Sequence, residues 1–261
     1  PRWLTNNEQE EQAFNILQKI SGKAVANSQI KEIKETIKQE SSSLKTLFKP
    51  DMFKLLIITV VMAILQQAVG INVILYYAPE IFKKLGSGVN SALLKTIVIG
   101  IFNMGFTIIA MATVDKFGRR PLLLFGSLGM AICLTSLGLL AFLQITSIFS
   151  LIFILGFISS FAFSVGPVTW IIIPEILPNK IRGKAMSIAT VFLWSTNYIV
   201  SQTFPIIDEN PWLIKHFHHG FSFWLYAIMC LFLFFFVLKL VPETKGKSLE
   251  EIEKELLSNI N

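Results

Sequence analysis

The chain has 261 residues, of which 53% are hydrophobic and only 15% are charged, and this balance argues against a soluble domain and for a membrane protein. The net charge of +6 does not indicate nucleic-acid binding, because no basic soluble face with aromatic platforms is visible. Neither the two cysteines nor the three histidines have metal-ligand spacing, so we expect no metal and no cofactor.

The first 52 residues are polar and form the first predicted region, a helical linker. Helical patterns run over 8–20 and 28–39. The apolar side chains of the first pattern fit a small amphipathic helix at a membrane face, and a solvated linker fits them equally well. They are Phe14, Ile16, Leu17 and Ile20.

Five long stretches without any charged residue follow the linker. A membrane-spanning helix needs roughly 20 apolar residues, so the longest stretch, 121–174, holds two helices, divided at the polar residues 144–147. We therefore predict an all-α polytopic membrane protein with a six-helix transmembrane bundle over 53–241 and a tail over 242–261. The six spans are expected near 54–78, 94–114, 121–143, 148–173, 185–207 and 220–241.

Lysine and arginine gather in alternate connections: before the first span, after the second and fourth spans, and after the sixth. The other connections are poorer in these residues. By the positive-inside rule, both termini are expected to be cytoplasmic.

The first span carries side-chain amides at Gln66, Gln67 and Asn72, although no charge occurs between Lys54 and Glu80. An unpartnered polar group at membrane depth costs several kcal/mol. Such amides can bind neighbouring helices together, which is one interpretation. Adjacent glutamines, however, lie about 100° apart on a helix, which favours a cavity as their common partner.

Other polar and aromatic residues occupy the later spans, and none is ionisable at neutral pH. Amides beside flat aromatic rings suit a ligand with many hydroxyl groups and apolar ring faces, whereas an ionic substrate would require a charge at this depth. Breaks near Gly70 and Gly166 support a shared site, because interrupted helices mark binding sites in transporters. The candidate residues are Gln66, Gln67, Asn72, Tyr76, Asn103, Phe161, Gly166, Trp170, Trp194 and Asn197.

Acidic and basic residues recur together in three connections on the predicted cytoplasmic side. They could be ordinary topology charges. We favour a gate of ion pairs and helix-terminus contacts that holds this side closed. Its predicted members are Asp115, Gly118, Arg119, Arg120, Glu175, Arg182 and Glu243.

At these residues the chain resembles the sugar porter family of the major facilitator superfamily, specifically its carboxy-terminal six-helix half. Within that family it most resembles the bacterial D-xylose and proton symporters, notably at 208–210 and 216–220. The start of the chain, at 1–4, is similar to the end of the span that precedes the linker in the family. The matching motifs are Gln66-Gln67-x-x-Gly70-Ile71-Asn72 with Tyr76-Tyr77, the turn 115–121, Gly166-Pro167-x-x-Trp170, Pro174-Glu175-Ile176-x-Pro178 with Arg182-Gly183, and Pro242-Glu243-Thr244-Lys245-Gly246.

The resemblance implies transport of a monosaccharide, a pentose or hexose such as xylose, by alternating access across the inner (plasma) membrane. The sugar would contact Gln66, Gln67 and Asn72, and the remaining candidates would complete the shell or line the cavity. Implied partners are the lipid bilayer, an amino-terminal six-helix half and protons, whose coupling groups in the family lie in that half.

Two departures from the family pattern bear on this implication. Leu193 stands where close relatives often have an amide, which affects sugar preference, and Ala162 replaces a glutamate of many animal carriers. Alternatives are an inactive fragment of a split or truncated transporter gene and a sugar receptor that does not transport. An enzyme is not expected, because no catalytic set lies within the spans.

Overall fold

The computed structural model describes residues 1, 4, 5, 7, 9–40, 47–84, 88–145, 148–179, 181–247 and 251–252. Several features named above therefore lie outside the described residues. These are Arg2 and Trp3, the start of the first helical pattern at Glu8, the divide at 146–147, and most of the tail beyond 247.

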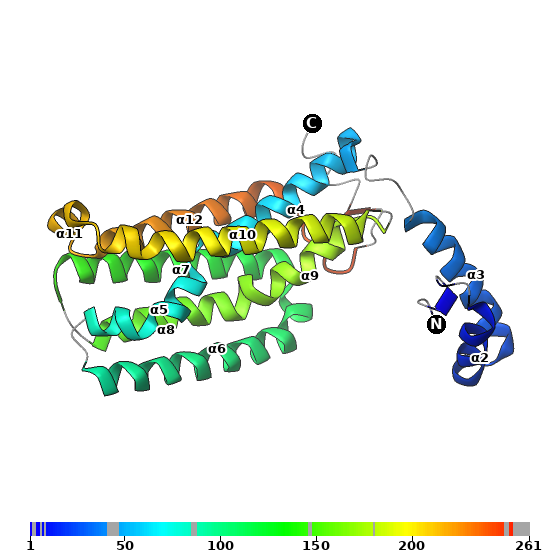
Figure 1. Ribbon diagram of the computed structural model, residues 1–261, viewed down its shortest axis with the longest axis horizontal. Helices are drawn as coiled ribbons and strands as arrows, with labels where there is room; N and C mark the ends of the chain where they lie inside the picture. Colours follow the sequence, from blue (N-terminus) through cyan, green and yellow to red (C-terminus); the bar gives the residue numbers. More distant parts are fainter. Residues whose placement is uncertain are drawn as a thin grey trace.

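Every regular element that the structure describes is helical, so the predicted all-α fold is confirmed. A helical hairpin lies beyond one end of an elongated bundle (Figure 1). The hairpin consists of α2 (Glu10–Ser21) and α3 (Lys23–Glu40). The bundle consists of α4 (Pro50–Ala68), α5 (Ile71–Lys84), α6 (Val89–Phe117), α7 (Arg119–Phe142), α8 (Ile148–Ser160), α9 (Gly166–Ile176), α10 (Arg182–Asp208), α11 (Pro211–Phe217) and α12 (Gly220–Leu240).

In the hairpin, α2 uses part of its predicted apolar face to pack against α3. Leu17 is buried, whereas Ile16 and Ile20 remain exposed. An ion pair of 2.6 Å between Lys34 Nζ and Glu10 Oε2 joins the two helices.

Five helical segments of the described chain are long and apolar enough to cross a membrane: Pro50–Lys83, Asn90–Phe117, Arg119–Phe142, Ile148–Ile176 and Gly220–Leu240. The prediction of six spans differs at 185–207, which lies in α10. This helix has 27 residues, and so is about 40 Å long. Its serine, threonine, asparagine and glutamine residues lower its hydropathy, and two of them, Asn197 and Ser201, form part of the site described below.

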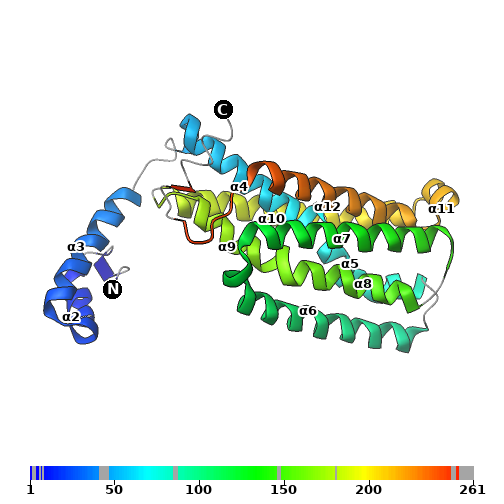
Figure 2. The same ribbon diagram turned by 180° about the vertical axis from the view of Figure 1, so that it is seen from behind.

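Helices approach closely where glycine faces another element. A Cβ atom on Gly138 of α7 would lie 2.4 Å from Trp224 Nε1 of α12, and one on Gly126 would overlap Ser164. Small residues of this kind allow membrane helices to pack backbone against backbone. As a result α7 and α12 run side by side (Figure 2), with Leu134, Leu137 and Cys230 buried in the bundle.

Both predicted helix breaks are present. Between α4 and α5, Gly70 has a left-handed φ of 84°, and a Cβ atom there would lie 2.7 Å from the ring of Tyr226. Only glycine satisfies both demands without strain. In the fourth predicted span, a π-helical turn over Phe161–Val165 separates α8 from α9, which begins at Gly166. Such turns in helices often occur at functional sites.

Candidate functional site

The break between α4 and α5 brings three side-chain amides from separate elements together. Asn72, at the start of α5, donates through Nδ2 to Gln67 Oε1 of α4 at 2.7 Å and to Asn197 Oδ1 of α10 at 2.9 Å. An amide nitrogen carries two hydrogens, so both donors of Asn72 are used. With Gln66, described next, these residues form what we call the amide row: Gln66, Gln67, Asn72 and Asn197.

Gln66 connects the amide row to the fourth predicted span. Its Nε2 atom donates to the backbone carbonyl of Gly166 at 3.2 Å, across the start of α9. Its Oε1 atom is buried and has no hydrogen-bond partner among the described residues. A buried acceptor left unpaired costs about 1–3 kcal/mol. Gln66 therefore has an unused acceptor, which is shielded from solvent in this conformation and would need a local shift to meet a hydroxyl group.

The amide row continues along the buried stripe of α10. Ser201 Oγ donates to Asn197 Oδ1 at 3.4 Å, and Tyr77 OH donates to the Ser201 carbonyl at 3.2 Å. The ring of Tyr77 lies 5.2 Å from that of Phe204. Tyr77 and Ser201 were not among the candidate residues, although the sequence signal was present in the Tyr76-Tyr77 pair and in the spacing of Ser201 from Asn197.

The remaining candidates are not hydrogen-bonded to the row. Tyr76, Trp170 and Trp194 are 57%, 43% and 56% exposed, so their rings are available to a ligand or to another part of a larger assembly. Phe161 is half-buried, and its ring lies 2.9 Å from where a Cβ atom on Gly166 would be. Asn103 is half-buried on α6, and no hydrogen bond of its side chain to the row is recorded within the described chain.

A second polar constellation joins three connections at the end of the bundle where α7 begins. Glu243, which follows α12, accepts at Oε1 from the backbone N–H of Arg119 and at Oε2 from that of Arg120, both at 3.0 Å. These N–H groups are in the first turn of α7, where no helical partner exists and a negative charge is favoured. Gly118 has a φ of 88°, and a Cβ atom there would lie 2.7 Å from Glu243 Oε2, so this contact requires glycine.

The Arg119 side chain links the same end to α6 and α9. Its Nη2 atom lies 2.9 Å from Asp115 Oδ1 and 3.1 Å from Glu175 Oε1. The other oxygen of Glu175 accepts from Thr244 Oγ1 at 2.6 Å. We call Asp115, Arg119, Glu175, Glu243 and Thr244 the charged cluster. Thr244 was part of a recognised motif but was not identified as a member, because its role depends on the path of the chain after α12.

Two predicted gate residues make other contacts. Arg120 donates through Nη2 to the Leu238 carbonyl at 2.6 Å, which ties α7 to the end of α12. Arg182 donates through Nε and Nη2 to the Leu177 carbonyl at 3.1 and 3.0 Å and so closes the connection between α9 and α10. Arg182 is thus held outside the charged cluster. Lys245 Nζ adds a bond of 2.6 Å to the Lys116 carbonyl.

Comparison with known protein families gives a match over nearly the whole chain. The family described as "Sugar (and other) transporter" matches residues 1–256. The chain belongs to this family. It is therefore a multi-pass membrane protein of a transporter family and not an enzyme, as the sequence predicted.

Individual members of the sugar transporter family show how much of a transporter the chain represents. It is 49% identical over 255 residues to the D-xylose-proton symporter of Escherichia coli K12 and 41% identical to the arabinose-proton symporter of Bacillus subtilis 168. Each match covers 97% of this chain, but 51% and 54% of the relatives. The chain thus spans about half the length of the curated relatives it matches.

Solved structures of sugar transporters support the same fold. A structure of the proton:xylose symporter XylE bound to 6-bromo-6-deoxy-D-glucose aligns with a TM-score of 0.80 at 48% identity, over 98% of this chain and 54% of that one. The inward-open conformation of XylE from E. coli aligns with a TM-score of 0.74 at 43% identity, over 98% of this chain and 51% of that one. The chain therefore has the fold of half of a major facilitator superfamily transporter.

Proposed function

We propose that this chain is the carboxy-terminal half of a monosaccharide transporter and carries most of its sugar-binding groups. It would work with an amino-terminal six-helix half by alternating access. The observation that carries this proposal is the amide row, in which four neutral amides from two separate spans meet. Exposed tryptophans occur one helical turn from two of its contacts, Trp170 after Gly166 and Trp194 before Asn197. Such groups complement a ring that has hydroxyl groups on its edge and C–H groups on its faces.

The amide row also has capacity for a ligand. Gln66 Oε1 has no hydrogen-bond partner among the residues that the structure describes, and Asn72 is only half-buried although both of its hydrogens are used. A sugar hydroxyl could donate to Gln66 Oε1, and other hydroxyls could replace the bonds between Asn72 and its neighbours. Because the amides hold one another in place before binding, little side-chain freedom would be lost when a sugar arrives.

The helix break suggests how binding would change the conformation. Asn72 begins α5, and Gly70 separates α5 from the packed helix α4, so α5 can tilt about this position more easily than a continuous helix. A sugar held by Asn72 and Gln67 together would favour the position of α5 that closes over the site. The charged cluster would hold the opposite end of the bundle shut until α7 and α9 separate.

In this proposal the charged cluster faces the cytoplasm, together with both termini, as the positive-inside rule predicts. The α11 end of the bundle then faces outward. The substrate is a pentose or hexose, because the similar proteins are named for D-xylose and arabinose. Two of these relatives are named as proton symporters, and we assign proton coupling to the amino-terminal half, because the amide row contains no ionisable group.

Uptake measurements test this proposal. The 261-residue chain would be produced together with an amino-terminal six-helix half, and uptake of labelled D-xylose, L-arabinose and D-glucose would be measured in cells that lack their own carriers. We expect uptake of at least one sugar, and Gln67→Ala or Trp170→Ala should weaken sugar affinity about fivefold or more, or ~1 kcal/mol per lost contact. Trp212→Ala is the matched control, because Trp212 is exposed on α11.

Three outcomes would contradict the proposal. Absence of uptake, with both halves present in the membrane, would favour an inactive fragment. Sugar binding without uptake would favour a receptor. Unchanged affinity in both site variants would show that the sugar binds elsewhere.

A further inference from the structure

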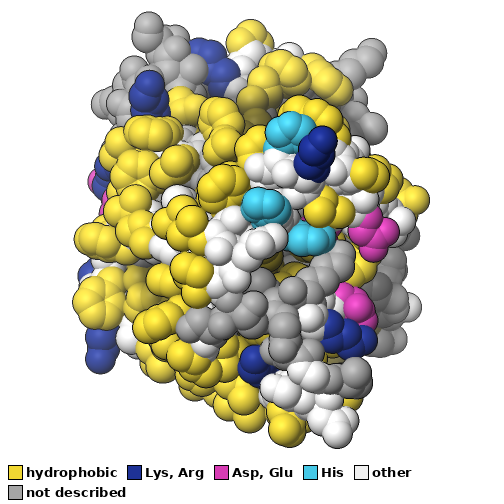
Figure 3. All heavy atoms as spheres, turned by 90° about the vertical axis from the view of Figure 1, so that its left-hand side faces the viewer, with side chains coloured by type: hydrophobic (Ala, Val, Ile, Leu, Met, Phe, Trp, Pro, Cys, Tyr) yellow, Lys and Arg dark blue, Asp and Glu magenta, His cyan; other side chains and the backbone are white. Residues whose placement is uncertain are grey.

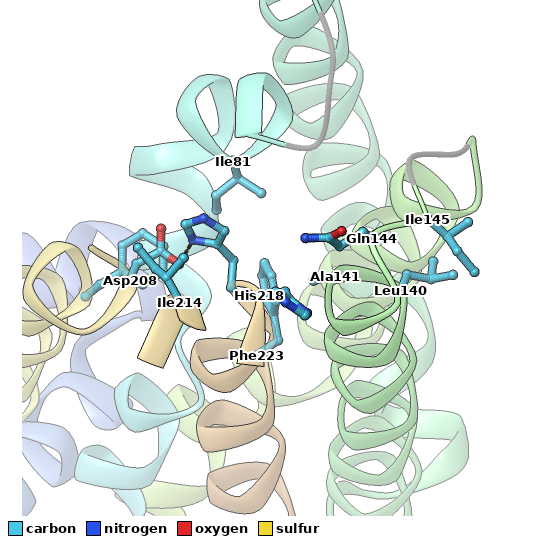
Figure 4. A pocket seen from close by; sticks show the side chains of 11 residues that line it. Ile81, Leu140, Ala141, Gln144, Ile145, Asp208, Ile214, His218 and Phe223 are labelled. Atoms are coloured by element: carbon cyan, nitrogen blue, oxygen red, sulfur yellow. Dashed lines mark ion pairs between the residues drawn. The ribbon is translucent and has the colours of Figure 1, made fainter. Parts of the chain in front are cut away.

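A recess of about 250 Å³ opens at the α11 end of the bundle, beyond the amide row. It lies among the ends of α5, α7, α10, α11 and α12, and Figure 4 shows their side chains converging on it. The three histidines of the chain gather over this face (Figure 3). Polar groups in the wall include Asp208, His218, His219 and Gln144. None of them was a predicted site residue.

Asp208 and His219 face each other across this recess. Asp208 is the last residue of α10 and is 6% exposed. Its Oδ1 atom lies 3.4 Å from Nδ1 of His219, which precedes α12, and a dashed line marks this contact in Figure 4. His219 Nδ1 is buried and makes no hydrogen bond within the described chain.

The turn that carries His219 is held in place from the other side. His218 and His219 both have left-handed backbone conformations, with φ of 46° and 67°. His218 Nδ1 lies 2.9 Å from the carbonyl of Phe142 of α7, and the two rings lie 5.7 Å apart. These contacts fix the turn to α7, and the same turn places the ring of His219 beside α10.

A proton is the smallest ligand that satisfies this arrangement. A proton on His219 Nδ1 would let this nitrogen donate a charge-assisted hydrogen bond to the carboxylate of Asp208. We propose that Asp208 and His219 form a proton-binding site whose occupancy holds the end of α10 to the start of α12. In the proposed orientation this site faces the outside of the cell.

Several titratable side chains lie near this pair. Glu80 of α5 and Glu209 line an adjoining recess with Asp208, and Tyr226 of α12 lies close enough to interact electrostatically with Asp208. Glu80 is paired with Lys83 at 2.8 Å, and α7 contributes the neutral Gln144. His218 is the only other titratable residue named among those that line the recess.

The sign of the pH dependence follows from which form makes the ion pair. Histidine side chains generally lose their proton near pH ~6.5. The charged link between α10 and α12 is therefore present when His219 carries the additional proton and is lost when rising pH removes that proton. Protonation would close the α11 end of the bundle, and deprotonation would loosen it.

Hydrogen exchange of the full chain in lipid nanodiscs tests this site without a sugar or a second half, so the result does not depend on the proposed transport. Exchange would be measured at pH 5.5 and pH 8 and corrected for the intrinsic effect of pH. We expect the backbone of 205–222 to exchange about threefold more slowly at the lower pH, as for a partly exposed ion pair. Asp208→Asn and His219→Gln should remove this difference.

Two further variants complete the test. His216→Gln should retain the pH effect, because His216 Nδ1 lies 2.8 Å from the carbonyl of Trp212 in its own helix. His219→Lys, which is charged at both pH values, should keep exchange slow at pH 8. It also shows that loss of the effect in His219→Gln is not a failure to fold. The proposal is overturned if wild-type exchange does not respond to pH, or if His219→Gln responds as the wild type does.

Discussion

The amide row and the charged cluster are both polar networks that join distant parts of the chain, but they differ in how fully their acceptor oxygens are used. In the charged cluster, both oxygens of Glu175 and both of Glu243 accept hydrogen bonds from within the chain. In the amide row, Gln66 Oε1 is buried without a partner in the described part of the chain, and Asn72 is half-exposed. The charged cluster has an unused donor, because Arg119 Nε is buried with no hydrogen-bond partner among the described residues, but its two shared carboxylates are fully engaged. Engaged acceptors stabilise a conformation, whereas an unused acceptor can bind a hydroxyl group.

The largest effect should come from removing the carboxylate that caps α7. Glu243 accepts from the backbone N–H groups of Arg119, Arg120 and Lys245 at 2.9–3.0 Å. Glu243→Ala leaves these donors without that partner, and we expect the free energy of unfolding to fall by about 3 kcal/mol. Denaturant unfolding in mixed micelles would measure this loss.

A graded control separates the cap from a general effect of substitution. Glu243→Gln keeps one acceptor oxygen but loses the negative charge at the start of α7, so it should lose roughly half as much stability as Glu243→Ala. If both variants unfold within ~0.5 kcal/mol of the wild type, the contacts of Glu243 contribute little to holding this end together.

An intermediate effect, on affinity rather than stability, should come from the amide row. Asn72→Ala removes the group that links Gln67 to Asn197, and we expect sugar affinity to fall roughly tenfold, or ~1.4 kcal/mol. The partners it leaves are acceptors beside a half-exposed position, so the loss of stability should be smaller. Calorimetric titration with sugar and denaturant unfolding of the same preparation would separate the two effects.

Asn103→Ala is the matched control for this comparison. It removes the same functional group from a half-buried position on α6, where no hydrogen bond to the row is recorded within the described chain. Its affinity should change less than that of Asn72→Ala. An equal loss in both variants would mean that the hydrogen bonds of the row do not determine which amides contact the sugar.

The sequence predicted the fold and the members of the amide row because both follow from local rules. Stretches without charge defined most spans, and Gly70 marked a break that its left-handed backbone requires. Gln67, Asn72 and Asn197 stood out because amides are rare at membrane depth. The direction of each side chain was less predictable. Tyr77 rather than Tyr76 donates to the buried face of α10. Neighbouring residues on a helix point about 100° apart, so a change of one position decides which tyrosine reaches α10.

Contacts that depend on how connections meet could not be predicted. Arg182 was grouped with the gate by its charge, yet it bonds the Leu177 carbonyl of its own connection. Thr244 and the pair of Asp208 with His219 depend on segments that come together only after all helices have packed. Single-residue chemistry identified candidates in these segments, but only the three-dimensional arrangement determines which of them become partners.

The smallest effect should distinguish the two carboxylates that share Arg119. Asp115 is 80% exposed in its side chain and Glu175 is 30% exposed, although both lie about 3 Å from the same Nη2 atom. Water and salt screen the more exposed pair, Asp115 with Arg119. Asp115→Asn should therefore reduce the free energy of unfolding by only ~0.3 kcal/mol, and high salt should abolish this difference from the wild type. Glu175→Gln should cost more and depend less on salt, because Glu175 is more buried and also accepts from Thr244. Unfolding of both variants at low and high ionic strength measures this contrast. Equal losses of stability in the two variants would show that Glu175, the more buried carboxylate, does not hold Arg119 more strongly than Asp115 does.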